Sequence, residues 1–469
     1  MLRVTLIHPP QFSEYPQPPM GLIQIAAVLE ARGYRVRIID ANVLGLYPAD
    51  IVPLVKETDV IGLTAMTPTV SRAIETAQEI KKVHPDLPVV LGGSHATLLP
   101  EETMAAAPSV DYLVRGEGEE SFIRLLFALE HDEPPDDIGG ISFRRDGEVI
   151  HVPQGEGMTE VDSLPFLAYN LIPLERYRPH PPHGRALPFA VLITSRGCPY
   201  NCAYCSKPVF GRKFRAQSPG RVVDEIESLH NKYGVREIAF YDDVFTLDKE
   251  RAYGISEELL SRGLNVTWSC ETRVNLVDRE LLAVMKRAGC YSISYGLESG
   301  SQEILDVINK NTTLEQAEEA VRHTREADIA AIGYFMVGSP GETPETIRQT
   351  IQLAKRLKLD FAQFSITTPF PGTELYSLYL KSGGSPDIPW EDYVYAGSGE
   401  GSAPVFESDA LSRADIVRWE KQAYREFYLR PAYLWQRILA CRSFGDFKIN
   451  LNGLSMLLGS LRSGRGGSR

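Results

Sequence analysis

Short runs of Val, Ile and Leu alternate with amphipathic helical segments along most of this chain. Within the first 145 residues, the predicted strands are 3–10, 35–40, 60–66, 88–95 and 112–118. Strands that are apolar throughout are buried on both faces, as in a parallel sheet covered by helices on both sides. We therefore predict a doubly wound, Rossmann-like α/β domain over residues 1–145. Ligands of such sheets bind beyond the carboxyl ends of the strands.

A second series of strands and helices follows a proline-rich passage, residues 146–187, which we interpret as a linker. The predicted strands of this series are 186–197, 237–243, 266–273, 291–299, 329–338 and 361–370. Six strands with intervening helices predict an open (β/α)6 partial TIM barrel over residues 188–385, with its chemistry at the strand carboxyl ends. Residues 386–469 lose this alternation and are predicted to form a helical extension that ends in a flexible basic tail.

The charge of the chain excludes some functions. The net charge is −12, which argues against general nucleic-acid binding.

No apolar run approaches the ~18 residues that span a bilayer, and the N-terminus MLRVTLIHPP does not resemble a signal peptide. Six cysteines in 469 residues, three of them clustered, fit a reducing compartment. We therefore predict a cytoplasmic protein.

The C-terminal segment reverses this charge. From Lys421 to Arg469 there are nine Lys and Arg against two acids, a balance of +7. The stretch YREFYLRPAYLWQRILACRSF places aromatic and basic residues at near-helical spacing. One interpretation is a helical cap on the barrel. The other is a helix that lies on an anionic membrane surface or covers a hydrophobic substrate.

Three cysteines follow the first predicted barrel strand at close spacing. Cys198, Cys202 and Cys205 form a C-x-x-x-C-x-x-C loop, with no fourth cysteine nearby. Three thiolates on a four-iron cluster leave one iron without a protein ligand, so that iron could bind a substrate. Zinc completed by histidine is the alternative, but His180, His183 and His230 do not have zinc-finger spacing.

The cysteine loop, with the aromatic Tyr204 directly before its last cysteine, resembles the signature of the radical S-adenosylmethionine (SAM) enzymes. The resemblance implies a 4Fe–4S cluster whose open iron is chelated by the amino and carboxylate groups of SAM. One-electron reduction, by a flavodoxin- or ferredoxin-type partner, would then cleave SAM to a 5′-deoxyadenosyl radical that abstracts hydrogen.

The same resemblance implies SAM contacts at the ends of later barrel strands. The candidates, in chain order, are Asp242, Asp243, Arg273, Glu298, Ser299, Gly338, Pro340 and Gly341. Carboxylates after strands also cap helices, and glycine and proline also build plain turns. Arg273 would pair with the SAM carboxylate or form a structural ion pair. Those alternatives stay open at the sequence level.

The front domain resembles the cobalamin-binding domains that precede some radical SAM barrels. The resemblance rests on HPP, GLTAMT, GGSHAT and RGEGE, each at the carboxyl end of a predicted strand. It implies that Thr64, Thr67, Gly92 and Gly93 approach the cobalamin nucleotide tail. The D-x-H-x-x-G box that supplies a lower histidine ligand is absent, and neither His8 nor His95 replaces it. A domain that has lost cobalamin therefore remains an alternative.

Together these features predict a cobalamin-dependent radical SAM enzyme that methylates or cyclises an unactivated carbon. The aromatic tail favours a small, largely apolar substrate of lipid, isoprenoid or tetrapyrrole type. The alternatives are a radical SAM enzyme with an empty front domain and an iron–sulfur electron carrier or redox sensor. We expect Cys270, Cys290 and Cys441 to be core residues, although Cys270 lies near a strand end that should face the active rim.

Overall fold

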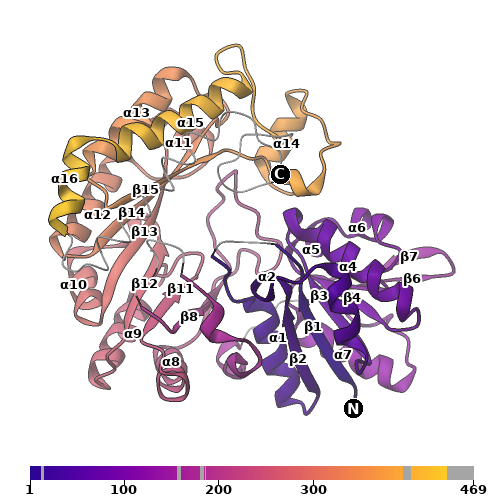
Figure 1. Cartoon of the computed structure of the whole chain (residues 1–469). Helices are drawn as coiled ribbons and strands as arrows, with labels where there is room; N and C mark the ends of the chain where they lie inside the picture. Colours follow the sequence, from indigo (N-terminus) through magenta and orange to yellow (C-terminus); the bar gives the residue numbers. More distant parts are fainter. Residues whose placement is uncertain (12–14, 156–159, 180–183, 185, 394–402, 441–469) are drawn as a thin grey trace.

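The computed structural model consists of two lobes joined through residues 146–187 (Figure 1). It describes residues 1–11, 15–155, 160–179, 184, 186–393 and 403–440. The predicted basic tail and Cys441 therefore lie outside the described residues. In the part of the chain that the structure describes, no helix is both long enough and apolar enough to cross a membrane.

The front lobe is a seven-stranded sheet with the order β2-β1-β3-β4-β5-β6-β7. Its first five strands are parallel, which confirms the predicted doubly wound domain. The strands are β1 (Arg3–His8), β2 (Arg35–Asp40), β3 (Val60–Thr64), β4 (Val89–Gly92), β5 (Tyr112–Val114), β6 (Ile141–Arg145) and β7 (Glu148–His151). Because β7 pairs antiparallel with β6, the sheet continues past residue 145 into the predicted linker. In this order the direction of winding changes between β1 and β3, where such sheets bind ligands.

Helices cover both faces of this sheet, and each face has its own core. They are α1 (Met20–Ala31), α2 (Ala41–Leu44), α3 (Pro48–Ile51), α4 (Val70–Val83), α5 (Ser94–Leu98), α6 (Pro100–Ala106) and α7 (Gly118–His131). The face under α1 and α7 belongs to one hydrophobic core that continues through the linker into the barrel. The two lobes are therefore packed together rather than merely tethered.

The second lobe is an open barrel of six parallel strands in sequential order, as predicted (Figure 1). The strands are β8 (Phe189–Leu192), β11 (Glu237–Phe240), β12 (Thr267–Thr272), β13 (Cys290–Glu298), β14 (Ala330–Val337) and β15 (Phe361–Ile366). The outer helices are α8 (Pro219–Tyr233), α9 (Lys249–Ser261), α10 (Arg279–Arg287), α12 (Leu314–Glu326) and α13 (Pro344–Arg356). Two further helices, α11 (Gln302–Val307) and α14 (Glu374–Lys381), lie at the carboxyl ends of the strands, where the main chains of Ile308 and Leu375 bond to Ala203. Thr313 and Thr343 begin α12 and α13 with capping boxes.

Tyrosine hydroxyls close both edges of the open barrel. On β8, the Tyr169 hydroxyl from the linker donates to the Val191 carbonyl at 2.6 Å and accepts from the Val191 N–H. On β15, the N–H groups of Phe364 and Ala362 donate to Tyr424 and Tyr428 of α15 (Arg413–Tyr428). Unpaired edge strands invite association, so these hydroxyls protect the sheet where closure is missing.

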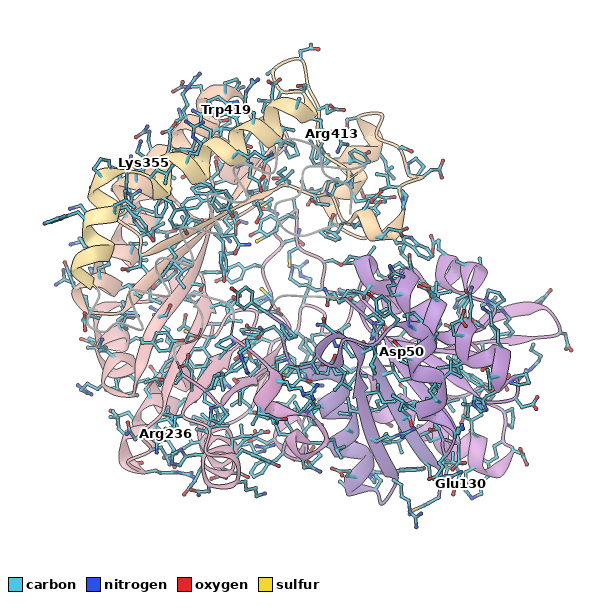
Figure 2. The ribbon with its side chains drawn as sticks, in the orientation of Figure 1. Asp50, Glu130, Arg236, Lys355, Arg413 and Trp419 are labelled. Atoms are coloured by element: carbon cyan, nitrogen blue, oxygen red, sulfur yellow. The ribbon has the colours of Figure 1, made fainter. Side chains whose placement is uncertain are left out.

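Residues 413–440 form a helical cap on the barrel, which is one of the two interpretations of the C-terminal segment. Helix α15 crosses β15 and α13, and Lys355 forms an ion pair there with Glu426 at 3.1 Å. Trp419 lies on the same helix under the Arg348 guanidinium (Figure 2). A further helix, α16 (Pro431–Ala440), follows and places the Tyr433 hydroxyl on the Asp360 carbonyl.

Glu420 is a buried carboxyl under this cap, and it should make stability depend on pH. Burial raises its pKa to about 7 from a usual 4.5, and one of its oxygens has no partner among the described residues. Because the folded pKa is the higher one, its stabilising contribution is complete below pH 4.5 and is lost as pH rises through 7. We expect Glu420→Gln to raise the free energy of unfolding at pH 8 by about 3 kcal/mol and to change little at pH 4.5. Melting temperatures of both proteins at the two pH values measure this; equal differences at both would contradict it.

Candidate active site at the carboxyl ends of the barrel strands

The three clustered cysteines lie on a loop that leaves the end of β8. A two-stranded antiparallel ribbon closes the base of this loop, with β9 (Ser195–Arg196) paired to β10 (Arg215–Ala216). Gly197, directly before Cys198, has a φ of 82°, and a Cβ there would lie 2.3 Å from the Lys213 carbonyl oxygen. Only glycine fits this turn, which directs the chain into the cysteine loop.

The thiols of Cys198, Cys202 and Cys205 are free and close enough to influence one another's ionisation. Burial raises the pKa of Cys198, while the Lys207 ammonium opposes this shift. No three His, Cys, Asp or Glu side chains of the described residues are gathered tightly enough to hold a single metal ion. Three thiolates on one loop are a suitable donor set for a four-iron cluster with one open iron, because each thiolate then binds a different iron.

The two aspartates after β11 occupy different environments. Asp242 is buried and braces the entrance of the cysteine loop, because it accepts hydrogen bonds from Thr194 and from the Ser195 hydroxyl. Burial raises the pKa of Asp242, and Arg251 opposes the shift. Asp243 is exposed and lies near the thiols, since its charge affects the pKa values of Cys198 and Cys205. Of the two, Asp243 is placed to meet a ligand.

Glu298, at the end of β13, is paired with a cation that the sequence analysis missed. Its carboxylate accepts from Lys310 at 2.7 Å and from the Tyr204 hydroxyl at 2.8 Å. Its φ of 60° is unusual for a residue other than glycine. This triad holds the aromatic residue of the cysteine motif against the barrel. Ser299 instead packs on α13, with its hydroxyl 3.2 Å from that of Thr350.

Arg273, after β12, lies against the cysteine loop. Its Nη1 donates to Sγ of Cys202 at 3.4 Å, and its Nη2 donates to the main-chain oxygen of Lys310. Its guanidinium also covers the ring of Tyr200, 3.8 Å from the ring centroid. Two of the three guanidinium nitrogens are thus committed to the loop. The third nitrogen, Nε, is buried and has no partner among the described residues, so it is the guanidinium nitrogen left for a further acceptor.

The glycines and proline after β14 form a tight turn. Gly338 and Gly341 have φ values of 85° and 78°, with Pro340 between them. A Cβ at Gly338 would meet Ile416 of α15, whereas a Cβ at Gly341 would meet nothing within 4 Å. Glu342 accepts from the N–H groups of Gly338 and Ser339, and burial raises its pKa to about 7. Gly341 is therefore the position of this turn with free space beside it.

A polar group on the inner face of the barrel was also missed from the sequence. Glu271 of β12 accepts from the Tyr334 hydroxyl of β14 at 2.9 Å. Tyr241, after β11, donates to Gln17 of the front lobe at 3.1 Å. The side chains of these two pairs, Glu271 with Tyr334 and Tyr241 with Gln17, are all half-buried. Burial raises the pKa of Glu271, and the charge of Asp243 raises it further. The period of two along a strand places Glu271 and Cys270 on opposite faces.

Cys270 is therefore a core residue, as expected, and its place near the strand end does not bring its thiol to the active rim. It is 2% exposed and lies beside Cys290 in the core under the outer helices. Cys290 is buried as predicted. Both behave as small apolar residues.

In the front lobe, the predicted cobalamin residues gather at the carboxyl ends of β3 and β4. Thr64 is half-buried, and Thr67 is buried with its hydroxyl 3.2 Å from Nδ1 of His95. Gly92 ends β4, and a Cβ there would make only ordinary contacts. Gly93 has a φ of 97°, and a Cβ there would lie 2.6 Å from the Ala65 carbonyl oxygen. The need for glycine at position 93 is thus explained by the neighbouring turn.

The two histidines of this lobe have separate roles. His8 lies 2.9 Å from Asp40, whose other oxygen accepts from Tyr177 of the linker. His95 is fully buried beneath Trp390, and burial lowers its pKa to about 4, so it is neutral. Its Nε2 has no partner among the described residues. The front lobe therefore contains a buried, neutral imidazole, His95, beside the predicted cobalamin residue Thr67.

A buried ion network joins the two lobes directly below the cysteine loop. Arg196, two residues before Cys198, donates to Glu117 at 2.6 Å and to Glu119 at 2.5 Å. Arg215, across the ribbon, is 2.5 Å from Glu117. The side chains of this network are all at most 8% exposed. The acidic part of RGEGE thus anchors the barrel to the front lobe.

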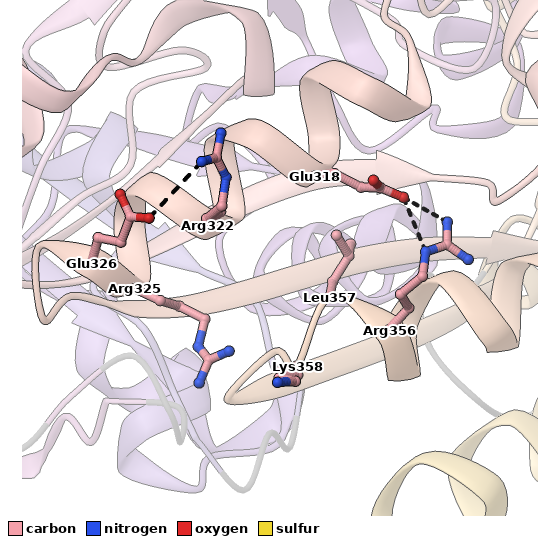
Figure 3. Close-up of a pocket in the computed structure, with 7 residues that line it drawn as sticks. All are labelled: Glu318, Arg322, Arg325, Glu326, Arg356, Leu357 and Lys358. Atoms are coloured by element: carbon pink, nitrogen blue, oxygen red, sulfur yellow. Dashed lines mark hydrogen bonds and ion pairs between the residues drawn. The ribbon is translucent and has the colours of Figure 1, made fainter.

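A cavity of about 470 Å³ between α12 and α13 is not part of this site (Figure 3). Its lining includes the end of α12 and residues just before β15, so it lies at the opposite edge of the sheet from the cysteine loop. Arg356 and Glu318 face each other across it as an ion pair at 2.8 Å. Cations near helix ends of this kind stabilise the helix dipole.

Comparison with known proteins identifies the family. Residues 192–354 match the radical SAM superfamily, and residues 13–126 match the B12 binding domain. An uncharacterized methyltransferase of Pyrococcus horikoshii is 35% identical over 95% of this chain and 96% of its own length. The chain belongs to the cobalamin-binding radical SAM enzymes. The anaerobic magnesium-protoporphyrin IX monomethyl ester cyclase of Rubrivivax gelatinosus is 31% identical over 92% of this chain and 78% of its own length.

Solved structures share the fold of this cobalamin-binding radical SAM enzyme. The radical SAM methyltransferase TsrM of Kitasatospora setae, with cobalamin and a 4Fe–4S cluster bound, superposes with a TM-score of 0.71. It is 22% identical and covers 91% of this chain and 85% of its own. The protein is thus an enzyme whose cofactors are a 4Fe–4S cluster, SAM and cobalamin. Three neighbouring thiols and the glycine-lined strand ends of the front lobe fit these groups.

Proposed function

We propose that this enzyme methylates or cyclises an unactivated carbon of a small metabolite, at a site between the cysteine loop and the front lobe. The observation that carries the proposal is the Arg196 network, which fixes the start of the cysteine loop to the cobalamin-binding lobe. When bound, the cluster supplies the electron that cleaves SAM to a hydrogen-abstracting radical, and cobalamin supplies a methyl group. The abstracted hydrogen would be carried away on 5′-deoxyadenosine. The resulting carbon radical would take a methyl group from cobalamin, or close a ring with loss of one electron to a bound cofactor and of one proton.

In this proposal Cys198, Cys202 and Cys205 hold the cluster. All three lie on one loop, closed by the β9–β10 ribbon, and are near enough to affect one another's pKa, which supports this role. Asp243 binds the SAM amino group, and the turn at Gly341 leaves room for the adenine. Thr64, Thr67 and Gly92 line the approach of the cobalamin tail. We assign supporting rather than ligand-binding roles to Asp242, Ser299 and Gly93, because protein groups already occupy their contacts.

We further propose a substrate with an extended apolar framework, of tetrapyrrole, isoprenoid or lipid type. The names of two related proteins support this class, since they act on a magnesium porphyrin ester and on a bacteriochlorophyllide. The free thiols of the cysteine loop require a reducing environment, which supports a cytoplasmic location and a flavodoxin- or ferredoxin-type reductant.

The proposal is tested by anaerobic reconstitution with iron, sulfide and hydroxocobalamin. We expect one retained corrinoid per chain. When SAM carrying a labelled methyl group is supplied with candidate tetrapyrroles or isoprenoids, methylation transfers the label to product carbon, whereas cyclisation yields an unlabelled product that has lost hydrogen. Failure to retain corrinoid would overturn the cobalamin role and favour the enzyme with an empty front domain.

Asp243 and Asp242 should respond differently to substitution. Asp243→Asn removes a charge-assisted hydrogen bond, so we expect the affinity for SAM to fall about tenfold or more with little loss of stability. Asp242→Asn should mainly lower the melting temperature, because Asp242 braces Thr194 and Ser195. Isothermal titration of SAM into the reconstituted proteins measures the first effect. Unchanged SAM affinity in Asp243→Asn would contradict the assignment.

We also propose that α16 contacts an anionic membrane surface. Trp435 is 63% exposed and Leu434 is 36% exposed on this helix. The sequence from Lys421 to Arg469, which includes the helix, has nine Lys and Arg against two acids. Exposed apolar side chains beside basic residues favour anionic lipid. Flotation should recover the protein with phosphatidylglycerol vesicles and not with phosphatidylcholine vesicles. Trp435→Ser should weaken the recovery, and equal recovery with both lipids would refute the proposal.

A further inference from the structure

Arg273 makes an unusual contact, because its guanidinium donates to a sulfur of the cysteine loop. The distance from Nη1 to Sγ of Cys202 is 3.4 Å, and Arg273 is only 5% exposed. Its other contacts are the Lys310 main-chain oxygen and the ring of Tyr200. These contacts fix the direction of the guanidinium, so its donor remains aimed at the sulfur.

The charge of Arg273 is not cancelled by a nearby acid. Over the residues that the structure describes, Arg273 forms no ion pair with a carboxylate; the adjacent Glu298 is paired with Lys310 instead. An arginine stays protonated at any pH the protein experiences. Because Arg273 is buried, water screens its charge weakly, and its effect on a neighbouring sulfur is correspondingly strong.

A cluster becomes more negative by one charge when it is reduced. Hydrogen bonds to its sulfurs and positive charges beside it therefore stabilise the reduced form more than the oxidised form. Arg273 provides both at the same sulfur atom. Arg212 provides a comparison on the same loop: it is exposed and donates to the Pro199 carbonyl oxygen, not to a thiol.

We propose that Arg273 raises the reduction potential of the cluster through its hydrogen bond to the Cys202 sulfur. The cluster is thereby brought within reach of a flavodoxin- or ferredoxin-type reductant. Arg273 is in this sense a positioning residue, which acts on the cluster through Cys202. This inference rests on the proposed ligation of the cluster by the three cysteines.

The test is the midpoint potential of the reconstituted cluster, titrated without SAM or substrate and followed by electron paramagnetic resonance. We expect the ratio of reduced to oxidised cluster at a fixed potential to fall about tenfold in Arg273→Met, which is a shift of about 59 mV to more negative potential. Arg212→Met removes a charge from the same loop without touching a sulfur. Its potential should equal that of the wild type.

Two results would overturn the inference. One is a complete cluster in Arg273→Met with the potential of the wild type, and the other is an equal shift in Arg212→Met. If Arg273→Met loses iron, Arg273→Leu takes its place, because it likewise removes both the N–H donor and the charge; a wild-type potential in that variant also refutes the role. A wild-type protein without a reducible cluster would refute the proposed function itself, so the two failures are distinguishable.

Discussion

Replacing Cys198, Cys202 and Cys205 together by alanine is expected to abolish both iron binding and cleavage of SAM. The three thiols can ligate iron as thiolates, and alanine keeps the Cβ atoms of the buried Cys198 and Cys202. Cys205 is exposed, and the loop is held by its backbone and by the β9–β10 ribbon. The variant should therefore remain folded while its iron content falls to background. Iron analysis and detection of 5′-deoxyadenosine after reduction measure the two losses.

The matched control is Cys270→Ala together with Cys290→Ala. These two cysteines are buried away from the loop, so their removal should lower stability by core truncation yet leave iron content unchanged. Iron retained by the triple variant, or iron lost equally in the control, would contradict the assignment of the cluster to this loop.

Arg196→Met is expected to destabilise the protein by about 3–5 kcal/mol, the largest effect we predict for one substitution. It leaves the carboxylates of Glu117 and Glu119 buried at the junction of the lobes without their principal cation. A buried charge without a partner costs far more than the pair contributes. Because Arg196 lies next to the cysteine loop, the variant should also bind corrinoid and cluster less firmly. Thermal unfolding and the retained cofactors measure both effects.

A surface arginine of the front lobe provides the comparison. Arg124 pairs with Asp137, and both side chains are well exposed, so Arg124→Met should cost less than about 1 kcal/mol. Adding Glu119→Gln to Arg196→Met should restore part of the lost stability, because Glu119 loses its cation in that variant whereas Glu117 keeps Arg215. A double variant less stable than Arg196→Met alone would contradict this explanation.

The fold was predictable from the sequence because its signals are local. Continuous Val, Ile and Leu runs, broken by helices with clear ends, specify two parallel sheets, and the spacing of three cysteines specifies the loop after β8. The end of the front domain was less visible. Strand β7, EVIH, is short and half-exposed, and only its pairing with β6 shows that it belongs to the sheet.

The roles of single side chains at the site depend on contacts that the sequence does not encode locally. Asp242 and Asp243 are neighbours in YDD, yet one turns inward to Thr194 and the other outward to the thiols. Lys310 has no motif of its own and meets Glu298 only because α11 returns to the barrel. For Cys270 a usable signal existed, since the alternation along β12 places it opposite Glu271. Glu117 lies in RGEGE, a stretch that the sequence links only to the cobalamin-binding resemblance, and the packed lobes reveal its pairing with Arg196.

The most direct test of the whole account is the behaviour of the reduced, reconstituted protein when SAM is added. Binding of SAM to the open iron should change the electron paramagnetic resonance spectrum of the reduced cluster, and 5′-deoxyadenosine should then accumulate. An unchanged spectrum without 5′-deoxyadenosine would contradict the account and leave an iron–sulfur protein that only carries electrons.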